Sequence, residues 1–486
     1  MKQFFFKFVA TFRCYSTKPT YHSTKWKAGS KKKLKSRNEE FTATTKRPRI
    51  KWTDEQLQVL DAVSTGKSVF VTGSAGTGKT ALMLEVIRRL RKMYGKSKVA
   101  VTASTGTASC ALHGLTLHCF AGTGIGDKDV ETLLLRVLSN RWAFHKWEKV
   151  EALVIDECSM IHADYFDKLE RIARSIRGGS KVWGGIQLVV GGDFFQLPPI
   201  LPKQQLMEKE FVFEADCWNA SFDLQIELKT IFRQSETLLV KLLQGIRRGE
   251  IDNDELKILE QRCNSTAAKE DTSAVQLFPR IEDVERVNQQ HLLSLDEDIV
   301  TYTALDSGEK RLKSNLKLGI APDQLDLCLG ARVILCKNLD VKHKLVNGAT
   351  GTIIDFRCDS DNGKKSIDPD IDFICESGSL IPVVKFDSGQ ELEIGPQTWS
   401  LMDAGKIVAQ RKQIPLMLAW ALSIHKSQGM TIDRLRTDLR RAFGYGMVYV
   451  ALSRVKTLDG LDLIGFSKSK IKAHPKVLQF YKEHFL

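Results

Sequence analysis

The chain has 486 residues, of which 43% are apolar, and it carries a formal net charge of +14. Its apolar content is sufficient to bury several cores, which excludes a wholly disordered chain, and its length corresponds to about three domains. Eleven positive charges lie in residues 1–38, which contain no acidic residue, so the rest of the chain carries only +3. Bulk charge is therefore weak evidence for a nucleic-acid partner.

Residues 1–50 are predicted to be a transit peptide followed by a disordered basic tail. The first residues combine phenylalanines with basic and hydroxyl side chains and no acid, which is typical of mitochondrial import. The stretch around Tyr15 (RCYS) resembles a matrix-processing site. Two basic patches, at 31–37 (KKKLKSR) and 46–49 (KRPR), keep the nucleus as an alternative or second location.

The cysteines and the longest apolar run exclude two further classes of protein. None of the ten cysteines forms a CxxC pair, so a structural zinc site is not expected. The longest apolar run, 414–424 (IPLMLAWALSI), is too short to span a bilayer. We therefore expect a soluble protein without membrane insertion.

The first α/β lobe is predicted over residues 51–229. Thr53 and Gln56 have the spacing of a capping box, and Leu57, Leu60 and Val63 would then share one helix face. Short β-branched runs and helical stretches alternate after this helix. The strands are expected at 69–72, 99–102, 153–156 and 187–190, and the helices at about 79–93, 130–139 and 164–176. This alternation predicts a parallel sheet with helices on both faces.

A second α/β lobe is predicted over 230–340 and 413–470, with a C-terminal tail or helix at 471–486. It starts near Thr230 and is expected to contain a strand at 275–279 followed by a helix at about 282–294.

A small β-barrel module is predicted at 341–412, inserted into the second lobe. Short alternating strands at 351–356, 381–386 and 392–394 surround a polar loop at 359–370 (DSDNGKKSIDPD). Such a texture favours antiparallel strands over βαβ units.

A phosphate-binding loop is predicted at residues 73–80 (GSAGTGKT), which match G-x-x-x-x-G-K-[ST]. A β-run precedes the loop and a helical pattern follows it, as this motif requires. Lys79 would hold the β- and γ-phosphates, and Thr80 would ligate Mg²⁺. The residues expected to cradle the nucleotide are Gly73, Ser74, Ala75, Gly76, Thr77, Gly78, Lys79 and Thr80.

Two adjacent carboxylates end an apolar strand at 152–157 (ALVIDE). A strand end places both of them at the rim of the sheet, beside the phosphate-binding loop. Asp156 would complete the Mg²⁺ shell and Glu157 would polarise an attacking water. This pair favours hydrolysis over phosphoryl transfer by a kinase, which must exclude water.

Three further polar residues are candidates for contacts to the transferring phosphate. Gln196 follows a third strand in GGDFFQ (191–196), where it could report the loss of the γ-phosphate. Arg233 in FRQ and Arg454 in ALSR are candidate arginine fingers from the opposite lobe.

Taken together, these motifs resemble the petite-integration-frequency (Pif) family of DNA helicases, a RecD-related branch of helicase superfamily 1. The resemblance covers about residues 51–466, with Cys158 and Ser109 as small departures. Eleven stretches follow the family's motif order: WTDEQ (52–56), GSAGTGKT (73–80), VTASTGTAS (101–109), GLTLHCFAG (114–122), LVIDECSM (153–160), GGDFFQLPPI (191–200), TIFRQ (230–234), GARVILCKNLD (330–340), LVNGATGTI (345–353), LAWALSIHKSQGMTID (418–433) and VYVALSRV (448–455).

The resemblance implies two RecA-like lobes that use ATP and Mg²⁺ to unwind DNA in the 5′→3′ direction. It further implies that Gln56 contacts the adenine and that Gln428 and Gly429 couple the nucleotide to the second lobe. Implied substrates are single-stranded and forked DNA and G-quadruplexes, and a preference for RNA–DNA hybrids stays open. The implied setting is mitochondrial or nuclear replication, repair, recombination and telomere maintenance, by a protein expected to be monomeric.

A translocase needs a sequence-tolerant grip on single-stranded DNA. Thr105 and Gly106 offer a hydroxyl and a backbone N–H at a strand end, suited to phosphates. Phe195, or alternatively Phe120, could stack on a base. The resemblance adds His118 and the second-lobe residues His425, Lys426 and Ser427. Residues 123–148, which include Arg141 and Trp142, are expected to form a small wedge.

Two other functions remain open from the sequence. A P-loop nucleotide kinase would share the phosphate-binding loop, although the adjacent carboxylates and the two distant arginines argue against it. A DNA-binding remodeller without productive ATPase activity would share the fold, although every ATPase residue is present.

Overall fold

A computed structural model of the chain describes residues 51–112, 114–199, 209–263, 274–308, 321–337, 339, 345, 349–358, 374–375, 380–403, 406–432 and 434–485. The chain divides after residue 51, and the unit described below is Trp52–Leu486. The predicted transit peptide, the predicted basic tail and the 359–370 loop lie outside the described residues.

The first lobe is a six-stranded parallel sheet with the strand order β3-β2-β4-β5-β1-β6. Its strands are β1 (Val69–Gly73), β2 (Val99–Ala103), β3 (Leu115–Thr116), β4 (Ala152–Asp156), β5 (Gln187–Gly191) and β6 (Leu224–Leu228). Its helices are α1 (Asp54–Ser64), α2 (Lys79–Tyr94), α3 (Gly106–Ala111), α4 (Leu117–Ala121), α5 (Val130–Ser139), α6 (Arg141–Lys149) and α7 (Ala163–Arg177). All four predicted strands and all three predicted helices of this lobe are confirmed.

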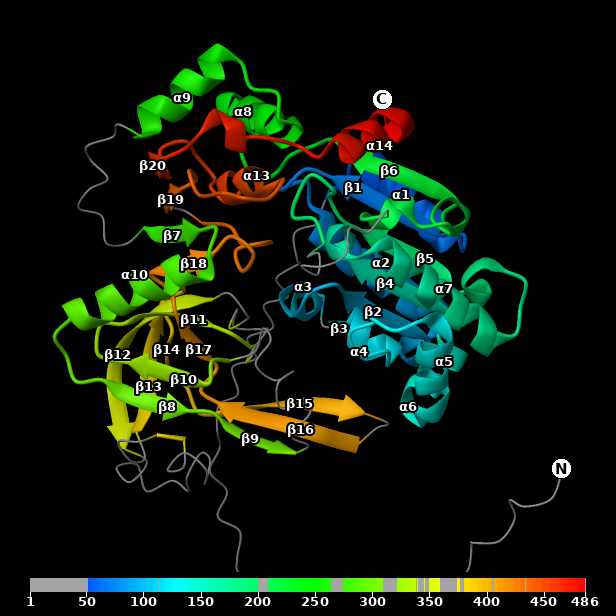
Figure 1. Cartoon of the computed structure of the whole chain (residues 1–486), viewed down its shortest axis with the longest axis horizontal. Coiled ribbons are helices and arrows are strands. Elements are labelled where there is room, and N and C mark those ends of the chain that lie inside the picture. The colour runs from blue at the N-terminus through cyan, green and yellow to red at the C-terminus, as the bar shows by residue number, and fades with distance from the viewer. Residues whose placement is uncertain are drawn as a thin grey trace, which may run out of the picture. The chain divides into compact units, whose positions relative to one another are not determined.

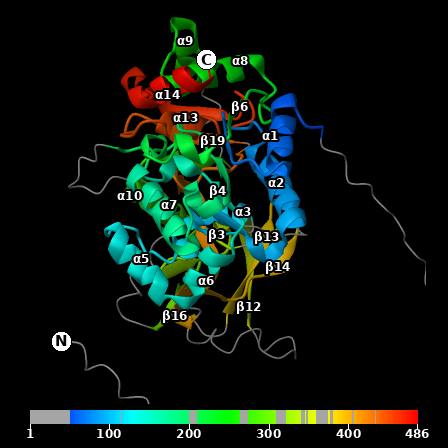
Figure 2. The ribbon, with the colours of Figure 1, turned by 90° about the vertical axis from the view of Figure 1, so that its right-hand side faces the viewer.

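Alternating strand residues supply two apolar cores, one on each face of this sheet. Val69 and Val71 of β1 pack with α1 and α2, whereas Phe70 packs with α5, α6 and α7. This follows from the two-residue period of a strand, which sends successive side chains to opposite faces. Figure 2 shows α1 and α2 on one side of the sheet and α5 and α7 on the other.

Helix α1 begins at the predicted capping box. The Thr53 hydroxyl accepts from the Gln56 backbone N–H, and the Gln56 side chain accepts from the Thr53 N–H. The predicted helix face is wrong at one position, because Leu57 is 41% exposed while Val59 is fully buried. The buried stripe therefore runs through Gln56, Val59, Leu60 and Val63.

The second lobe is a four-stranded parallel sheet with the order β18-β7-β19-β20. Its strands are β7 (Val275–Phe278), β18 (Ala421–Ser423), β19 (Leu435–Asp438) and β20 (Leu461–Gly465). Its helices are α8 (Thr237–Arg248), α9 (Asn253–Cys263), α10 (Ile281–Ser294) and α13 (Met447–Leu452). One apolar core contains residues of α8, α9 and α13 together with the sheet. The predicted α/β character of both lobes is confirmed.

The β module consists of antiparallel strands that Figure 1 shows below the second parallel sheet. A five-stranded sheet has the order β14-β13-β12-β11-β17, β10 pairs with β8, and a three-stranded sheet has the order β15-β16-β9. The strands are β8 (Val300–Thr303), β9 (Leu305–Gly308), β10 (Gln324–Leu327), β11 (Arg332–Leu335), β12 (Thr350–Cys358), β13 (Leu380–Phe386), β14 (Glu391–Glu393), β15 (Gln397–Asp403), β16 (Lys406–Gln413) and β17 (Leu416–Leu418).

The predicted limits of this module, 341–412, are too narrow. Strand β11 pairs with both β12 and β17, and β8 and β10 bury residues in the same core as β12 and β13. The module therefore extends from about residue 300 to residue 418.

The chain ends in helix α14 (Pro475–Phe485), which packs on the first lobe although it follows the second lobe in sequence. Its residues Val477, Phe480 and Tyr481 are buried in the core that contains α5, α6 and α7. In Figure 1, the red α14 lies beside β6.

Short 3₁₀ helices connect several of these elements. They are η1 (Lys96–Lys98), η2 (Cys158–Met160), η3 (Val182–Gly185), η4 (Val212–Glu214), η5 (Asn219–Ser221) and η8 (Lys468–Lys470). Within the described ranges, no helix has the length and apolar character that crossing a bilayer requires.

Candidate active site

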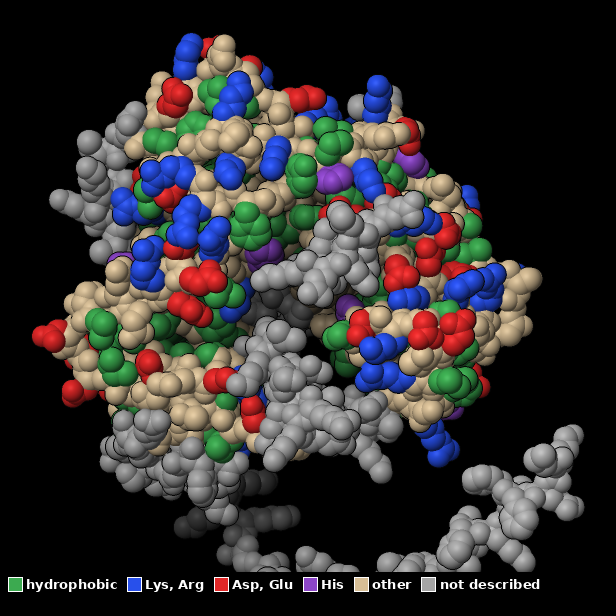
Figure 3. Space-filling view, viewed as in Figure 1, with side chains coloured by type: hydrophobic (Ala, Val, Ile, Leu, Met, Phe, Trp, Pro, Cys, Tyr) green, Lys and Arg blue, Asp and Glu red, His purple; other side chains and the backbone are tan. Residues whose placement is uncertain are grey.

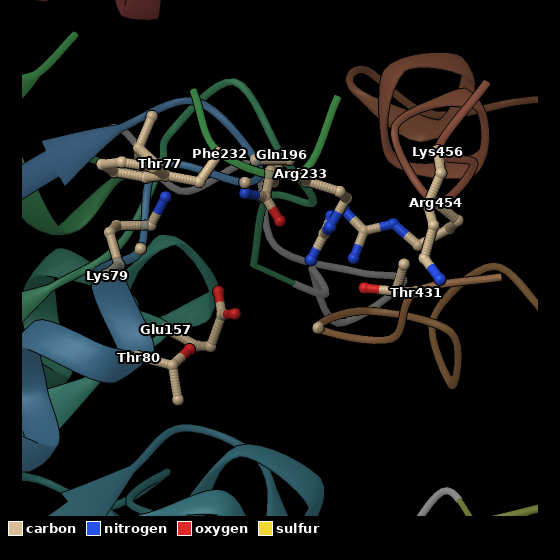
Figure 4. Close-up of a pocket in the computed structure, with 14 residues that line it drawn as sticks. Thr77, Lys79, Thr80, Glu157, Gln196, Phe232, Arg233, Thr431, Arg454 and Lys456 are labelled. Carbon is tan, nitrogen blue, oxygen red and sulfur yellow. The ribbon is translucent and has the colours of Figure 1, made fainter. Parts of the chain in front are cut away.

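A cavity of about 450 Å³ lies between the phosphate-binding loop and segments of the second lobe. Eleven of the residues predicted from the sequence line it: Ala75, Gly76, Thr77, Gly78, Lys79, Thr80, Glu157, Gln196, Arg233, Gly429 and Arg454. Figure 4 shows Lys79, Thr80 and Glu157 facing Arg233, Arg454 and Thr431 across the cavity. Residues far apart in sequence are thus brought together as the motif order predicts.

The phosphate-binding loop joins β1 to α2 and holds Lys79 over its own backbone. The Lys79 ammonium donates to the carbonyl oxygens of Gly73 (2.5 Å) and Ser74 (3.0 Å). Gly76 has a φ of +86°, and a Cβ at this position would lie 2.6 Å from the Cβ of Arg233. Only glycine therefore permits the loop to approach the 230–234 segment so closely.

The two carboxylates end β4, as predicted. The Asp156 carboxylate accepts from the Glu157 backbone N–H at 2.9 Å. Glu157 has a left-handed backbone, with φ at 52°, a conformation that costs about 1–3 kcal/mol for a residue other than glycine. The Ser104 hydroxyl, which donates to the Glu157 carbonyl at 2.7 Å, helps to hold this turn.

Glu157 is bonded across the cavity to the second lobe. The Gln428 side-chain N–H₂ group lies 2.8 Å from Oε2 of Glu157 and 3.5 Å from Oε1 of Gln196. One amide thus contacts two strand ends of the first lobe. Gln428 does not itself line the cavity, but it reaches two residues that do.

Both arginines predicted as fingers lie at the cavity and are held by backbone carbonyls. Arg233 donates to the Ser453 carbonyl at 3.0 Å. Arg454 donates to the Val450 carbonyl at 2.8 Å and to the Ser453 hydroxyl at 2.8 Å. These bonds leave both guanidinium groups at the wall opposite Lys79, as Figure 4 shows.

The cations of this cavity are incompletely compensated. Burial lowers the pKa values of Lys79 and Arg233, and burial followed by the charge of Arg233 lowers the pKa of Arg454 to about 10. Burial, and then the charge of Asp156, raises the pKa of Glu157 to about 7. Desolvated cations of this kind are stabilised by a bound polyanion, so the cavity is suited to a nucleoside triphosphate.

Four predicted nucleotide-site residues lie behind the cavity wall. Gly73 and Ser74 accept from Lys79, and Asp156 lies beside Glu157. Gln56 is 3% exposed and its amide donates to the Thr77 carbonyl at 3.3 Å. In this structure Gln56 supports the loop and completes the capping box.

Sequence reasoning missed three residues that line the cavity: Phe232, Thr431 and Lys456. Phe232 is 57% exposed, and its backbone N–H donates to the Gly76 carbonyl at 2.8 Å. An exposed ring beside the phosphate-binding loop is suited to stacking on a base. Its position within TIFRQ, next to Arg233, was the sequence feature that could have indicated a place at the cavity.

The residues predicted to bind DNA fall into two groups. Thr105, Gly106, His118, His425 and Lys426 lie at or near strand ends. The Thr105 hydroxyl caps α3 by accepting from the Ala108 N–H at 3.2 Å, and the His118 ring stacks on Tyr165 with centroids 4.6 Å apart. His425 and Lys426 follow β18 and are half-buried.

The other group is buried in this structure, which does not favour the predicted DNA contacts. Phe195 is 4% exposed because its ring packs against Tyr481 and under the Arg247 guanidinium, and Phe120 is 2% exposed. Ser427 is fully buried, and its hydroxyl donates to the Ile424 carbonyl at 2.9 Å. For Phe120, the apolar neighbours in the sequence already favoured a place in the core.

The predicted wedge contains α5 and α6. Lys146 of α6 lies 3.2 Å from the ring centroid of Trp142, and burial lowers the pKa of Lys146 to about 8. Elsewhere, as Figure 3 shows, Lys and Arg side chains are interspersed with Asp and Glu on the face in view. This mixture agrees with the low net charge outside residues 1–38.

Two family models match the chain. The model described as PIF1-like helicase matches residues 51–255, and the model described as DNA helicase Pif1, 2B domain, matches residues 311–356. The second match falls within the β module.

The chain is similar to proteins named ATP-dependent DNA helicase PIF1. It is 37% identical over 478 residues to the one from Emericella nidulans, covering 88% of this chain and 62% of the relative. It is 39% identical over 434 residues to the one from Xenopus laevis, covering 89% of this chain and 64% of the relative. The chain thus spans somewhat less than two thirds of the length of these relatives.

Two solved structures are similar over nearly their whole length. The crystal structure of Pif1 helicase from Candida albicans has a TM-score of 0.80 and 37% identity, covering 89% of this chain and 99% of that chain. A crystal structure of Pif1 helicase from Bacteroides in complex with ADP-AlF3 and ssDNA has a TM-score of 0.66 and 27% identity, covering 90% and 98%.

Proposed function

Because this chain belongs to the PIF1-like helicase family, we propose that it is an ATP-dependent DNA helicase that moves 5′→3′ along single-stranded DNA and unwinds duplexes. The observation that carries the proposal is the contact between Gln428 of the second lobe and Glu157 of the first, at 2.8 Å. The bond crosses a cavity lined by the phosphate-binding loop and two arginines. Binding or hydrolysis of a nucleotide in this cavity would therefore affect residues of both lobes.

In the proposed cycle, the loop backbone and Lys79 bind the β- and γ-phosphates of ATP. Glu157 orients and polarises the attacking water, and burial raises its pKa, which favours its role as a proton acceptor. Arg233 and Arg454 stabilise the charge that develops on the transferring phosphate, a contribution of ~10³–10⁵ in rate in related nucleotide hydrolases. A kinase would need to exclude water from Glu157, so this carboxylate favours hydrolysis.

Mg²⁺ is the proposed cofactor. Mg²⁺ is commonly held by one or two carboxylates together with the substrate phosphates, so few protein ligands are needed. The Thr80 hydroxyl and the Asp156 carboxylate fit this donor set, because both offer oxygen atoms: Thr80 ends the phosphate-binding loop and lines the cavity, and Asp156 lies directly beside Glu157. When bound, the ion would neutralise charge on the β- and γ-phosphates.

The proposed DNA substrates are single-stranded, forked and G-quadruplex DNA, with RNA–DNA hybrids as a further class. Solved structures of Bacteroides Pif1 bound to ssDNA, and of forked dsDNA with two coordinating Pif1 helicases, support the first two classes. In this chain, we propose that Thr105, Gly106, His118, His425 and Lys426 contact the strand.

We also propose that the protein acts in mitochondrial genome maintenance, with the nucleus as a second location, and that it works as a monomer. The acid-free, phenylalanine-rich start of the sequence supports mitochondrial import. Replication, repair, recombination and telomere maintenance are the corresponding processes. Import of residues 1–50 fused to a fluorescent protein tests the address directly.

The decisive experiment compares unwinding of duplexes that carry either a 5′ or a 3′ single-stranded tail. We expect ATP- and Mg²⁺-dependent unwinding from the 5′ tail, together with ATPase activity stimulated by single-stranded DNA. Unwinding only from the 3′ tail would overturn the direction, and the absence of DNA-stimulated ATPase would overturn the class.

Lys79→Ala is the control for this experiment, because it removes the phosphate contact while leaving the DNA-binding residues intact. The variant should bind single-stranded DNA and fail to hydrolyse ATP or to unwind. Normal unwinding by this variant would instead support a remodeller that does not depend on ATP hydrolysis.

A further inference from the structure

The carboxylate of Asp193 is a fully buried charge behind the nucleotide cavity, two residues beyond the end of β5. Both of its oxygens are engaged. Oδ1 accepts from Arg247 Nη2 (2.9 Å), the Tyr481 hydroxyl (3.3 Å) and the Phe195 N–H (3.3 Å). Oδ2 accepts from the Gln196 amide (3.3 Å) and from Arg247 Nε (3.4 Å).

Arg247 reaches Asp193 from the second lobe. It lies on α8, whose residues Leu239, Leu242, Leu243 and Ile246 are buried in the second-lobe core. Arg247 is 3% exposed and also bonds Glu227 of β6 at 3.2 Å. One turn earlier, Gln244 of the same helix donates to the Ser74 hydroxyl in the phosphate-binding loop at 3.2 Å. Helix α8 is therefore fastened to the first lobe at two points beside the nucleotide.

Tyr481 reaches the same carboxylate from the C-terminal helix. Its hydroxyl is hydrogen-bonded to that of Thr72, the residue just before the phosphate-binding loop, and to Asp193. The centroid of its ring lies 4.5 Å from the ring centroid of Phe195 and 5.1 Å from Cζ of the Arg247 guanidinium. Tyr481 thereby ties β1, the 193–196 segment and α8 into one buried cluster.

Gln196 connects this cluster to the cavity, because it bonds Asp193 and also lines the cavity. With one amide N–H₂ hydrogen directed to Asp193, the amide oxygen of Gln196 is turned toward Gln428, which bonds Glu157. The start of α13 also approaches this segment closely, because a Cβ on Gly446 would lie 2.3 Å from the Gln196 carbonyl oxygen. A carboxylate that loses one partner turns to satisfy the others, so the orientation of Gln196 depends on all the donors around Asp193.

We propose that Arg247 and Tyr481 are positioning residues that orient Gln196 through Asp193, so that α8 and the C-terminal helix set the geometry of the nucleotide site. This inference rests on the proposed ATPase function. Tyr481 and Arg247 reach the cavity-lining Gln196 through their hydrogen bonds to Asp193, so their effect is expected in turnover more than in ATP binding.

The test is a double-mutant cycle between Tyr481→Phe and Gln196→Ala, measured as kcat and KM of DNA-stimulated ATP hydrolysis. Tyr481→Phe keeps the ring against Phe195 and Arg247 and removes only the hydroxyl. We expect kcat to fall about tenfold, the effect of misplacing one hydrogen bond to a charged group, while KM for ATP changes less than about twofold. In the Gln196→Ala background, the same substitution should change kcat less than about twofold.

Lys482→Ala is the matched control, because Lys482 is the next residue of α14 and is exposed. It should leave kcat, KM and the thermal unfolding midpoint unchanged. Equal losses of kcat from Tyr481→Phe in both backgrounds would overturn the inference, as would an unchanged kcat or a change confined to KM. A wild-type chain without DNA-stimulated ATPase would instead overturn the proposed function, so the two failures are distinguishable.

Arg247→Lys provides a second arm that keeps the positive charge. It replaces a guanidinium that bonds both oxygens of Asp193 with a single ammonium. Its loss of kcat should also shrink in the Gln196→Ala background. A loss of the same size in both backgrounds would contradict a route through Gln196.

Discussion

The nucleotide cavity and the proposed DNA-binding face are both made at strand ends, but they differ in how their residues connect the two lobes. At the cavity, Gln428 of the second lobe bonds Glu157 of the first, and Gln244 of α8 bonds Ser74 of the phosphate-binding loop, so both contacts join the two lobes. On the proposed DNA-binding face, two contacts stay within one lobe or its inserted module: the His118 ring stacks on Tyr165, and the Lys426 ammonium lies 3.5 Å from the Met417 sulfur.

This difference separates two tasks. Groups at the cavity can sense how the lobes lie, because each lobe supplies a partner. Groups on the DNA face move with the lobe that carries them. If the lobes separate during a cycle, the contacts between lobes at the nucleotide cavity break, whereas each lobe keeps its own DNA contacts. A protein that translocates along a strand needs this arrangement.

One of the two largest effects should come from Arg454, which lies at the cavity wall opposite Lys79. Arg454→Lys keeps a positive charge and loses the fixed fork that bonds Val450 and Ser453. We expect kcat of DNA-stimulated ATP hydrolysis to fall by ~10³, at the lower end of arginine-finger effects. Arg440→Lys is the control, since Arg440 is exposed and pairs with Asp438. A fall of less than about tenfold would mean that Arg454 serves mainly to hold the lobe together.

Glu157→Gln separates chemistry from lobe contact. The new amide keeps an oxygen that can accept from Gln428, so the bond between lobes survives, but it cannot take a proton. We expect kcat to fall by ~10²–10⁴ while nucleotide and DNA affinities stay within about twofold. Phosphate release and fluorescence anisotropy measure these quantities. A large loss of ATP affinity would show that Glu157 acts in binding.

These two residues also mark what the sequence alone could predict. Each lies in a contiguous motif whose chemistry depends on local structure, a buried strand followed by a turn or a helix. The strands around them were predictable because apolar β-branched runs of four or five residues end at polar or glycine positions. The cavity could therefore be assembled from strand ends before any contact was known.

Features set by tertiary packing were not predictable in this way. Phe195 follows a strand end like Gln196, yet the C-terminal helix covers it, and no local pattern shows that α14 folds back onto the first lobe. The β15–β16 hairpin was missed because its strands carry Arg411, Lys412 and Gln413, which lack clean apolar alternation. Arg411 is buried there by ion pairs to Asp306 and Asp323, partners about 90 residues or more away in sequence.

Phe232 offers a smaller test on the nucleotide side. Its exposed ring lies at the cavity, so Phe232→Ala should weaken ATP binding by the value of one stacking contact, about 0.5–1.5 kcal/mol. The expected result is a rise of about two- to tenfold in KM for ATP with kcat nearly unchanged. Phe232→Tyr should retain wild-type KM. A fall in kcat without a rise in KM would place the ring in lobe movement.

The smallest effect concerns the charge on the DNA face. Lys426 should contact one phosphate, so Lys426→Ala should lower the slope of log K against log salt for single-stranded DNA by about 0.7. Burial lowers the pKa of His118, which leaves its ring uncharged at pH 7.5. His118→Ala should therefore weaken the binding of single-stranded DNA severalfold and leave the slope of log K against log salt unchanged.

The double variant tests whether the two residues act independently. Because they belong to separate lobes, the double variant should lose the sum of both DNA-binding free energies. Strong coupling between them without nucleotide would show that DNA itself joins the lobes, and the division between sensing and gripping residues would then fail.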